Sequence, residues 1–214
     1  MTARPQSFLG LRVGTRMTVI RLPDGGLWVH SPVALDDGLR GALDDLGPVR
    51  YVVAPNRFHH LYVGDYAEAY PQAQLHGAPG LSRKRSDVPW SAELGERPAG
   101  WADALEQVTF DGMSMKETVF FHAASATLVV TDLLENFESS DHWPTRAYLK
   151  MGGTHGKPGI SRFLRVFFRD HAATRAHLDR VLAWPFERVV VCHGEVLERG
   201  GPEVLRDSFT WLRV

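Results

Sequence analysis

The sequence has few features that would tie the chain together covalently or carry it into a membrane. Its single cysteine, Cys192, excludes an internal disulfide and any all-cysteine metal site, which fits a reducing compartment. No stretch reaches the roughly 18 uncharged apolar residues of a membrane span. Arg12 and Arg16 interrupt the N-terminal region before any signal-like apolar block. We therefore expect a cytoplasmic protein with no membrane partner.

An excess of charge of one sign is also missing. Lys and Arg number 24 against 25 Asp and Glu, which leaves a formal net charge of -1. Proteins that bind nucleic acid usually carry an excess of basic residues, so this balance disfavours a nucleic-acid partner and a nuclease. No G-x-S-x-G nucleophile elbow or phosphate-binding loop is present, which leaves serine-hydrolase and nucleotide-dependent chemistry unsupported. A small-molecule substrate is the remaining expectation, and the sequence leaves the oligomeric state open.

The chain shows no internal repeat, low-complexity tract or Ser/Gly-rich linker, so we predict one domain over residues 1–214. Its hydrophobic content of 44% is sufficient for a substantial core. Expected strands lie at residues 17–22, 27–32, 49–55, 73–80, 105–110, 117–123, 126–132 and 186–193, and expected helices at residues 34–48, 61–70, 160–168, 169–184 and 200–212. Hairpins mixed with helix-strand units predict an α/β protein with two packed sheets and helices outside them.

Ten histidines are the compositional feature that points to chemistry, because imidazole is the commonest metal ligand and the usual acid or base near neutral pH. Polar residues recur where expected strands end: His59 and His60 follow strand 49–55, and Asp132 and His193 end two later strands. Strand ends are where α/β sheets usually place their chemistry. For each residue a structural role stays open; His60, for example, could instead bond to backbone at the start of a helix.

Other polar residues also have both a functional and a structural interpretation. Asp65, five residues after His60, is a candidate additional ligand or a group that orients an imidazole. Arg83 and Arg85 could bind an anionic substrate, or they could be a solvated surface. The stretch 139–159 is expected to be a long connection that acts as a lid or pocket wall. Its two histidines, His142 and His155, could complete a coordination sphere, whereas His122 and Cys192 favour structural roles.

The pattern of strands and strand-end residues resembles the metallo-β-lactamase superfamily. The resemblance is carried by the segments LPDGGLWVHSP, LGPVRYVVAPNRFHHLYVGDY, LVVTDLLEN and VVVCHGE. It is strongest for a divergent branch described only as a domain of unknown function. The resemblance implies an αββα four-layer sandwich over nearly the whole chain.

The resemblance also indicates which family ligands this chain has lost. The family's His-x-His-x-Asp-His motif aligns with NRFHHL, residues 56–61, so that Asn56, Phe58 and Leu61 stand at histidine positions and His60 at the aspartate position. The family's later aspartate and last histidine match Asp132 and His193, and its middle histidine has no counterpart between residues 110 and 117. The resemblance therefore implies one divalent metal held by His60, Asp132 and His193. Zn²⁺ suits this set best, with Fe²⁺ or Mn²⁺ as alternatives.

Two functions follow from this reading. The first is a metal-dependent hydrolase of a small ester, thioester, lactone or phosphoester, in which Asp132 or an uncoordinated His59 accepts a proton. His59, Asp65 and His155 would then lie around the ligands or add to them, and Arg83 and Arg85 would bind substrate. The alternative is a catalytically silent relative that binds a ligand or a protein, for which the lost ligands are the sequence support.

Overall fold

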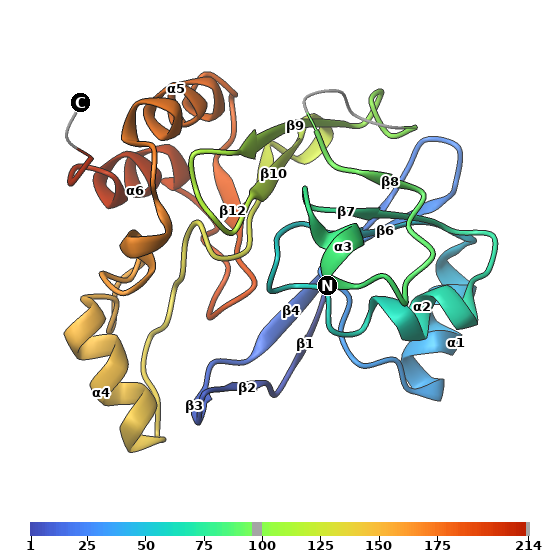
Figure 1. The fold of residues 1–214 in the computed structure, drawn as a ribbon, viewed down its shortest axis with the longest axis horizontal. Coiled ribbons are helices and arrows are strands. Elements are labelled where there is room, and N and C mark those ends of the chain that lie inside the picture. Colours follow the sequence, from blue (N-terminus) through green and yellow to red (C-terminus); the bar gives the residue numbers. More distant parts are fainter. Residues whose placement is uncertain (96–99, 213–214) are drawn as a thin grey trace.

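The structure, a computed structural model, describes residues 1–95 and 100–212, and their secondary structure is arranged in layers (Figure 1). The strands are β1 (Thr2–Arg4), β2 (Ser7–Phe8), β3 (Leu11–Arg12), β4 (Thr15–Arg21), β5 (Leu27–His30), β6 (Val49–Ala54), β7 (Gln74–Gly77), β8 (Ala92–Glu93), β9 (Leu105–Phe110), β10 (Glu117–His122), β11 (Thr127–Val129) and β12 (Arg188–Val190). The helices are α1 (Asp37–Leu46), α2 (Val63–Ala69), α3 (Leu81–Lys84), α4 (Trp143–Gly152), α5 (His171–Leu182) and α6 (Gly201–Ser208), with 3₁₀ turns at Ala123–Ser125 and Leu164–Phe167.

The strands form two main sheets. One has the order β1-β4-β5-β6-β7-β8, antiparallel from β1 to β5 and parallel from β5 to β8. The other has the order β12-β11-β10-β9, in which only β11 and β12 are parallel. Strands β2 and β3 pair as a separate hairpin. The carboxyl ends of β11 and β12 are neighbours, because Val129 pairs with Val190, so the loops that follow them start side by side.

Three hydrophobic clusters separate the four layers. The first joins the larger sheet to α1, α2 and α3, with Leu43 and Tyr66 among its buried side chains. The second lies between the two sheets and is rich in aromatic residues such as Trp28 and Phe120. The third joins the smaller sheet to α5 and α6 through residues such as Leu178. Figure 1 shows α1 and α2 on one side of the molecule and α5 and α6 on the other. The predicted αββα four-layer sandwich is confirmed.

Local sequence explains where the elements start and stop. Asp36 caps α1 by accepting a hydrogen bond from the Leu39 backbone N–H at 2.8 Å. Gly47 ends α1 with φ +146°, and a Cβ there would lie 2.6 Å from the carbonyl oxygen of Gly25. Only glycine fits this position, since the conformation and the close approach both exclude a side chain.

Two predicted segments differ from the structure. The predicted helix at 160–168 contains only the 3₁₀ turn Leu164–Phe167. The predicted connection at 139–159 contains α4, a helix of ten residues. Pro144 stands in the first turn of α4, where no N–H partner is needed, and Gly153 ends it with φ +81°. Gly152 and Gly153 therefore mark the end of a helix within this stretch. No helix in the described parts of the chain is long and apolar enough to cross a membrane.

Candidate metal centre

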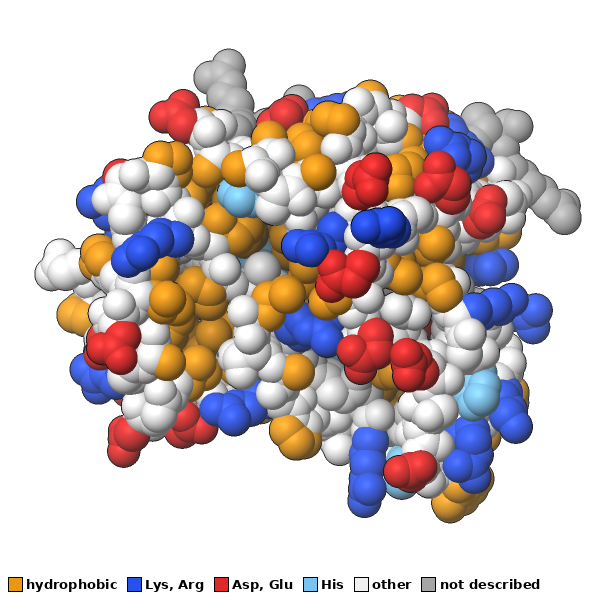
Figure 2. Space-filling view, turned by 180° about the vertical axis from the view of Figure 1, so that it is seen from behind, with side chains coloured by type: hydrophobic (Ala, Val, Ile, Leu, Met, Phe, Trp, Pro, Cys, Tyr) orange, Lys and Arg blue, Asp and Glu red, His pale blue; other side chains and the backbone are white. Residues whose placement is uncertain are grey.

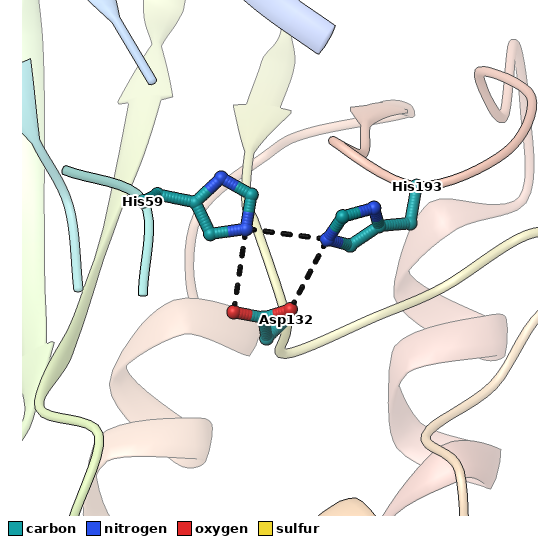
Figure 3. Close-up of side chains that lie close together, drawn as sticks. All are labelled: His59, Asp132 and His193. Carbon is teal, nitrogen blue, oxygen red and sulfur yellow. Dashed lines mark hydrogen bonds and ion pairs between the residues drawn. The ribbon is translucent and has the colours of Figure 1, made fainter. Parts of the chain in front are cut away.

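Three loops that follow strands bring His59, Asp132 and His193 together (Figure 3). His59 lies in the loop after β6, Asp132 in the loop after β11, and His193 in the loop after β12. The two Nε2 atoms lie 3.2 Å apart. His59 Nε2 lies 3.4 Å from Asp132 Oδ2, and His193 Nε2 lies 3.3 Å from Asp132 Oδ1. All three side chains are largely buried, and in Figure 3 their polar atoms point toward a common centre.

These separations match the geometry of a bound cation. A tetrahedral Zn²⁺ with bonds of about 2.0–2.1 Å places its ligand atoms roughly 3.3 Å from one another. The three ligand atoms all lie within 4.8 Å of each other, and this is the only such group of His, Cys, Asp or Glu in the described residues. Two imidazole nitrogens aimed at each other and at a carboxylate need a proton or a metal ion between them. The types of donor and their separations fit a divalent metal.

The surroundings of His193 fix its tautomer in the form that a metal needs. His193 Nδ1 lies 2.9 Å from the carbonyl oxygen of Gly14, which can only accept, so Nδ1 keeps a proton and Nε2 is the nitrogen that offers a lone pair when the ring is neutral. Gly194 follows with φ +90°, and a Cβ there would lie 1.9 Å from the carbonyl oxygen of Asn136. His59 Nδ1 in turn bonds with Ser31 Oγ at 2.7 Å.

Asn56 and Glu117 hold the loops around Asp132. Asn56 Nδ2 donates to Asp132 Oδ2 at 2.7 Å, while Asn56 Oδ1 accepts the backbone N–H groups of Phe58 and His59, both at 2.9 Å. The buried carboxylate of Glu117 accepts the backbone N–H of Asp132 at 2.9 Å. Asn56 thus links two of the three clustered side chains, and the Glu117 carboxylate fixes the backbone that carries one of them.

Burial and pairing act in opposite directions on the charges of the centre. Burial alone would lower the pKa of His193, but its hydrogen bond to Asp132 outweighs this and raises that pKa to about 9. Burial would raise the pKa of Asp132, yet the neighbouring His59 and the bonds to both imidazoles hold it far below its usual range. Burial and the charge of Asp132 raise the pKa of Glu117 to about 7. Asp132 therefore stays ionised and attracts a cation or proton to the cluster.

The structure brings together only part of the predicted ligand set. Asp132 and His193 converge as expected, but the third member is His59 rather than His60. The His60 ring lies against Arg85, with Nδ1 3.2 Å from Arg85 Nη1, and its pKa is lowered to about 4 by burial and by Lys84 and Arg85. Adjacent residues point in different directions, and Asn56 Oδ1 turns the backbone so that His59 faces the cluster. Metal ligation and the catalytic roles of His59 and Asp132 stay predictions.

The other candidate residues lie outside the cluster. Asp65 is exposed in the first turn of α2, and Arg83 is exposed on α3. Arg85 pairs with Asp87 at 2.6 Å and donates to the His60 carbonyl oxygen, so its guanidinium is already engaged by the chain itself. His155 pairs through its backbone with Phe137, whose ring stacks on His193, and His155 is not a member of the cluster.

Two further histidines and the cysteine have local partners. His142 bonds with Thr145 Oγ1 at 2.9 Å, and His122 bonds with Ser125 Oγ at 2.7 Å. Cys192 is buried with Sγ 3.2 Å from the Arg16 carbonyl oxygen, and burial raises the pKa of its thiol. These contacts agree with the structural roles favoured for His122 and Cys192.

Sequence reasoning missed three residues that shape the centre: Asn56, Ser31 and Gly14. The family pattern marks Asn56 only as a lost ligand, but an asparagine directly after a strand commonly bonds to backbone N–H groups two and three residues on. Ser31 has φ +53°, an unusual value for a serine that no sequence pattern reveals. The role of Gly14 depends on its carbonyl, which every residue type offers, so no sequence signal could have found it.

A cavity of about 420 Å³ lies beside the loop that carries His193, next to Cys192 and Gly194. It is lined by Ala3, Arg4, Arg12, Val13, Gly14, Thr15, Arg16, Phe137, Glu138, Ser139, Cys192, Gly194 and Glu195. Arg16 Nη1 donates to the Val191 carbonyl oxygen at 2.6 Å, while the guanidinium of Arg12 has no bonded partner in the described ranges. The cavity is therefore polar, with both basic and acidic side chains, and its lining includes none of the three clustered residues.

Comparison with known proteins supports this architecture. The family model described as "Domain of unknown function (DUF4336)" matches residues 3–82. A metallo-β-lactamase from Pontibacter korlensis superimposes with a TM-score of 0.67 at 12% identity, covering 98% of this chain and 92% of that chain. The chain has a metallo-β-lactamase fold. The predicted resemblance to the metallo-β-lactamase superfamily is confirmed for the fold, and the match to the domain of unknown function covers residues 3–82.

Two further solved structures have the same fold. A metallo-β-lactamase from Hirschia baltica gives a TM-score of 0.59 at 12% identity and covers 97% of this chain and 90% of that chain. The metal-soaked Flv1 flavodiiron core from Synechocystis sp. PCC6803 gives a TM-score of 0.63 at 14% identity. The match covers 95% of this chain and 54% of that chain, so this chain spans about half of the flavodiiron core. No match is found among curated proteins. At these identities the likeness shows the fold, and the chemistry has to be argued from the cluster.

Proposed function

We propose that this protein is a metal-dependent hydrolase with a single divalent metal, Zn²⁺ first and Fe²⁺ or Mn²⁺ as alternatives. The observation that carries the proposal is the set of separations of 3.2 to 3.4 Å among His59, Asp132 and His193. Two imidazoles and one carboxylate leave a fourth position for water or substrate, as catalytic zinc sites require.

The role of Asn56 supports one metal rather than two. Because Asn56 Oδ1 accepts backbone N–H groups, its Nδ2 faces Asp132 and presents hydrogen atoms there. A second cation beside Asp132 Oδ2 would meet this N–H donor, which repels a positive charge and occupies a lone pair of the carboxylate. Asn56 thus stands where the family motif has a histidine ligand, and its amide holds Asp132 in place instead.

His59, Asp132 and His193 would hold the metal. When bound, it supplies Lewis acidity that polarises a substrate oxygen and makes water a better nucleophile at neutral pH. Asp132 keeps its negative charge at neutral pH, so it offers the metal an anionic ligand and lowers the net positive charge of the centre. Ser31 and the Gly14 carbonyl orient the two imidazoles.

The substrate class follows from the chemistry that a metal-activated water can perform. We infer a small ester, thioester, lactone or phosphoester. Arg12 lines the cavity beside the loop of His193 and is a candidate to bind an anionic group of the substrate, while the substrate-binding roles of Arg83 and Arg85 stay predictions. The single cysteine supports a reducing, cytoplasmic setting for this activity.

The test combines metal analysis with activity. Protein produced with zinc, iron and manganese supplied is analysed for bound metal and assayed against a panel of small esters, thioesters, lactones and phosphoesters. We expect about one metal per chain, with hydrolysis lost on chelation and restored by adding metal back. His59→Ala and His193→Ala should lose both metal and activity. A chain that holds metal without hydrolysing any substrate class would favour the silent binding relative, and a chain that holds no metal would overturn the proposal.

A further inference from the structure

Most of the large hydrophobic side chains exposed to solvent gather at one end of the molecule. They belong to the turn of the β2–β3 hairpin and to the stretch from α4 to the 3₁₀ turn at Leu164–Phe167, and we call this region the α4 surface. Its exposed members are Phe8, Leu9, Trp143, Met151, Phe163 and Val166. Leu9 is 88% exposed and Trp143 is 71% exposed, values that leave both side chains almost wholly in water. Exposed apolar groups at this density indicate a binding surface.

Contacts between the segments show that these residues form one surface. The backbone N–H of Arg12 in β3 donates to Thr145 Oγ1 in α4 at 2.8 Å. The rings of Tyr148 and Phe163 stack with centroids 5.2 Å apart, which joins α4 to the segment that follows it. Figure 1 shows the hairpin and α4 next to each other at the lower edge of the molecule. An aromatic contact also connects this surface to the metal centre. The ring centroids of Phe8 and Phe58 lie 6.1 Å apart, and Phe58 is the residue before His59.

The backbone conformation at the hairpin turn explains why Leu9 is exposed. Leu9 has φ +47°, a conformation that a leucine rarely adopts, and Gly10 follows with φ +80°. These two residues form the turn between β2 and β3, and a two-residue hairpin turn of the favoured type needs positive φ at both positions. The turn therefore accounts for the conformation of Leu9, and it holds the leucine side chain out in water.

The charge of the same region is strongly positive. Residues 140–170 contain six basic residues, Arg146, Lys150, Lys157, Arg162, Arg165 and Arg169. They contain two acidic residues, Asp141 and Asp170, so the segment carries a formal charge of +4 in a chain whose net charge is -1. None of the six forms an ion pair within the described ranges. In Figure 2 basic side chains gather at the lower right, over α4, while acidic and basic groups are mixed across the centre of that face.

We propose that the α4 surface binds the anionic headgroups of a lipid membrane. Bulky apolar residues insert at the boundary between headgroups and acyl chains while basic residues neutralise the lipid charge, and tryptophan favours that boundary. A second copy of this chain would bring two surfaces of charge +4 together, which charge repulsion opposes. Nucleic acid would use the basic residues but would leave Leu9, Trp143 and Val166 without apolar partners.

The proposal departs from the expectation that the protein has no membrane partner. That expectation used the lack of a membrane-spanning stretch, which does not exclude binding to headgroups at the membrane surface. The charge of the whole chain also hides a positive segment that acidic residues elsewhere balance. The surface adjoins the metal centre through Phe8 and Phe58. Membrane binding would therefore hold the centre close to lipid, although the inference does not depend on what the centre hydrolyses.

The test is co-sedimentation of the full chain with vesicles of phosphatidylcholine alone and of phosphatidylcholine mixed with phosphatidylserine. We expect binding to the mixed vesicles that weakens as salt is raised, and little binding to phosphatidylcholine. Arg146→Glu with Lys150→Glu should weaken binding by more than about 25-fold, at about fivefold for each cation lost. Leu9→Asn with Trp143→Ser should weaken it at least about tenfold, and asparagine tolerates the conformation at position 9.

Leu46→Ser is the matched control, because Leu46 is 49% exposed on α1, outside the α4 surface. It should bind the mixed vesicles like the parent chain, and thermal unfolding should show that all variants are folded. Equal binding to both vesicle types, or unchanged binding by the Leu9 and Trp143 variant, would overturn the proposal. A concentration-dependent dimer that this variant abolishes would assign the surface to a second copy instead.

Discussion

Two buried histidines, His30 and His193, lie in contrasting surroundings. His30 ends β5 inside the aromatic cluster between the sheets, stacked on Trp28 with ring centroids 5.3 Å apart and edge-on to Phe120. Within the described residues neither of its ring nitrogens has a hydrogen-bond partner. His193 is also buried, but it bonds with Asp132 through one nitrogen and with the Gly14 carbonyl through the other.

The partner, rather than burial, decides the charge of each ring. Burial, aided by the nearby His59, lowers the pKa of His30 to about 3. Burial also acts against the charged form of His193, yet the bond to Asp132 raises that pKa to about 9. His30 is thus a neutral aromatic side chain of the core, whereas His193 retains an affinity for cations. The two sites adjoin, because Ser31, the residue after His30, bonds with His59 of the metal centre.

The largest effect is expected from removing the carboxylate that distinguishes the two environments. Asp132→Ala leaves His193 and His59 buried with no anion between them, so the site resembles that of His30. We expect Zn²⁺ affinity to fall by ~100-fold or more, since this group is itself a ligand and even groups that only orient ligands contribute 10–100-fold. Titration calorimetry measures the effect, with exposed Asp179→Ala as the control. Affinity within a few-fold of the parent would contradict the assigned centre.

A smaller loss is expected when the carboxylate stays but loses its support. Asn56→Ala removes the donor to Asp132 Oδ2 and the acceptor for the His59 backbone N–H. Zn²⁺ affinity should fall by about 10–100-fold, because both side chains gain freedom. Unfolding free energy should fall by about 1–3 kcal/mol, as buried polar groups lose partners. The same calorimetry and chemical denaturation apply, with exposed Gln72→Ala as the control. If affinity is unchanged while stability falls, Asn56 has only a structural role.

The stability of the protein in acid tests the environment of His30, the buried histidine without a charged partner. A pKa of about 3 in the folded chain against an ordinary 6.5 means that His30 stabilises the fold fully above pH 6.5 and less as pH falls toward 3. At pH 5 the loss should reach about 2 kcal/mol, at 1.36 kcal/mol for each pH unit. His30→Phe keeps a flat apolar ring against Trp28 and cannot be protonated. Denaturation from pH 7 to pH 5 should therefore show a smaller loss in the variant; equal losses would mean that another group controls acid unfolding.

The smallest effect on metal binding is expected from a substitution at His60, and this distinguishes His60 from the adjacent His59. His60→Ala removes a ring that lies against Arg85, so Zn²⁺ affinity should change by less than about twofold, within the noise of neutral substitutions. Unfolding free energy should fall by about 1 kcal/mol through the lost contact. His59→Ala is the matched comparison at the adjacent position and should lose metal binding. A loss of metal in the His60 variant would restore the ligand set first inferred from the sequence.

Much of the layered fold could be predicted, because hydrophobic patterning reports local burial. Strands such as Val49–Ala54 and helices such as α5 follow from apolar spacing and capping residues, and the strand-end positions of Asp132 and His193 follow from the same patterns. The exposed position of Leu46 could not be predicted in this way. It shares a helical face with the buried Leu43, but the helix ends at Leu46, where nothing covers it.

The choice between two adjacent histidines shows where local patterns stop being informative. Each offers the same ligand chemistry, and neither spacing nor composition tells which ring turns toward Asp132. That choice depends on Asn56, which bonds to Asp132 across 76 positions of sequence while it fixes the backbone of His59.

The amino-acid sequence by itself determined the layers, the strand ends and the chemical types of residue available there, since these depend on local burial and chain stiffness. Only the tertiary structure decided that His59 rather than His60 meets Asp132 and His193. It also decided that Leu9 and Trp143 share one basic surface. Both results require side chains from distant segments to be brought within a few ångströms of each other, and that proximity is set by how the two sheets pack and not by the residues themselves.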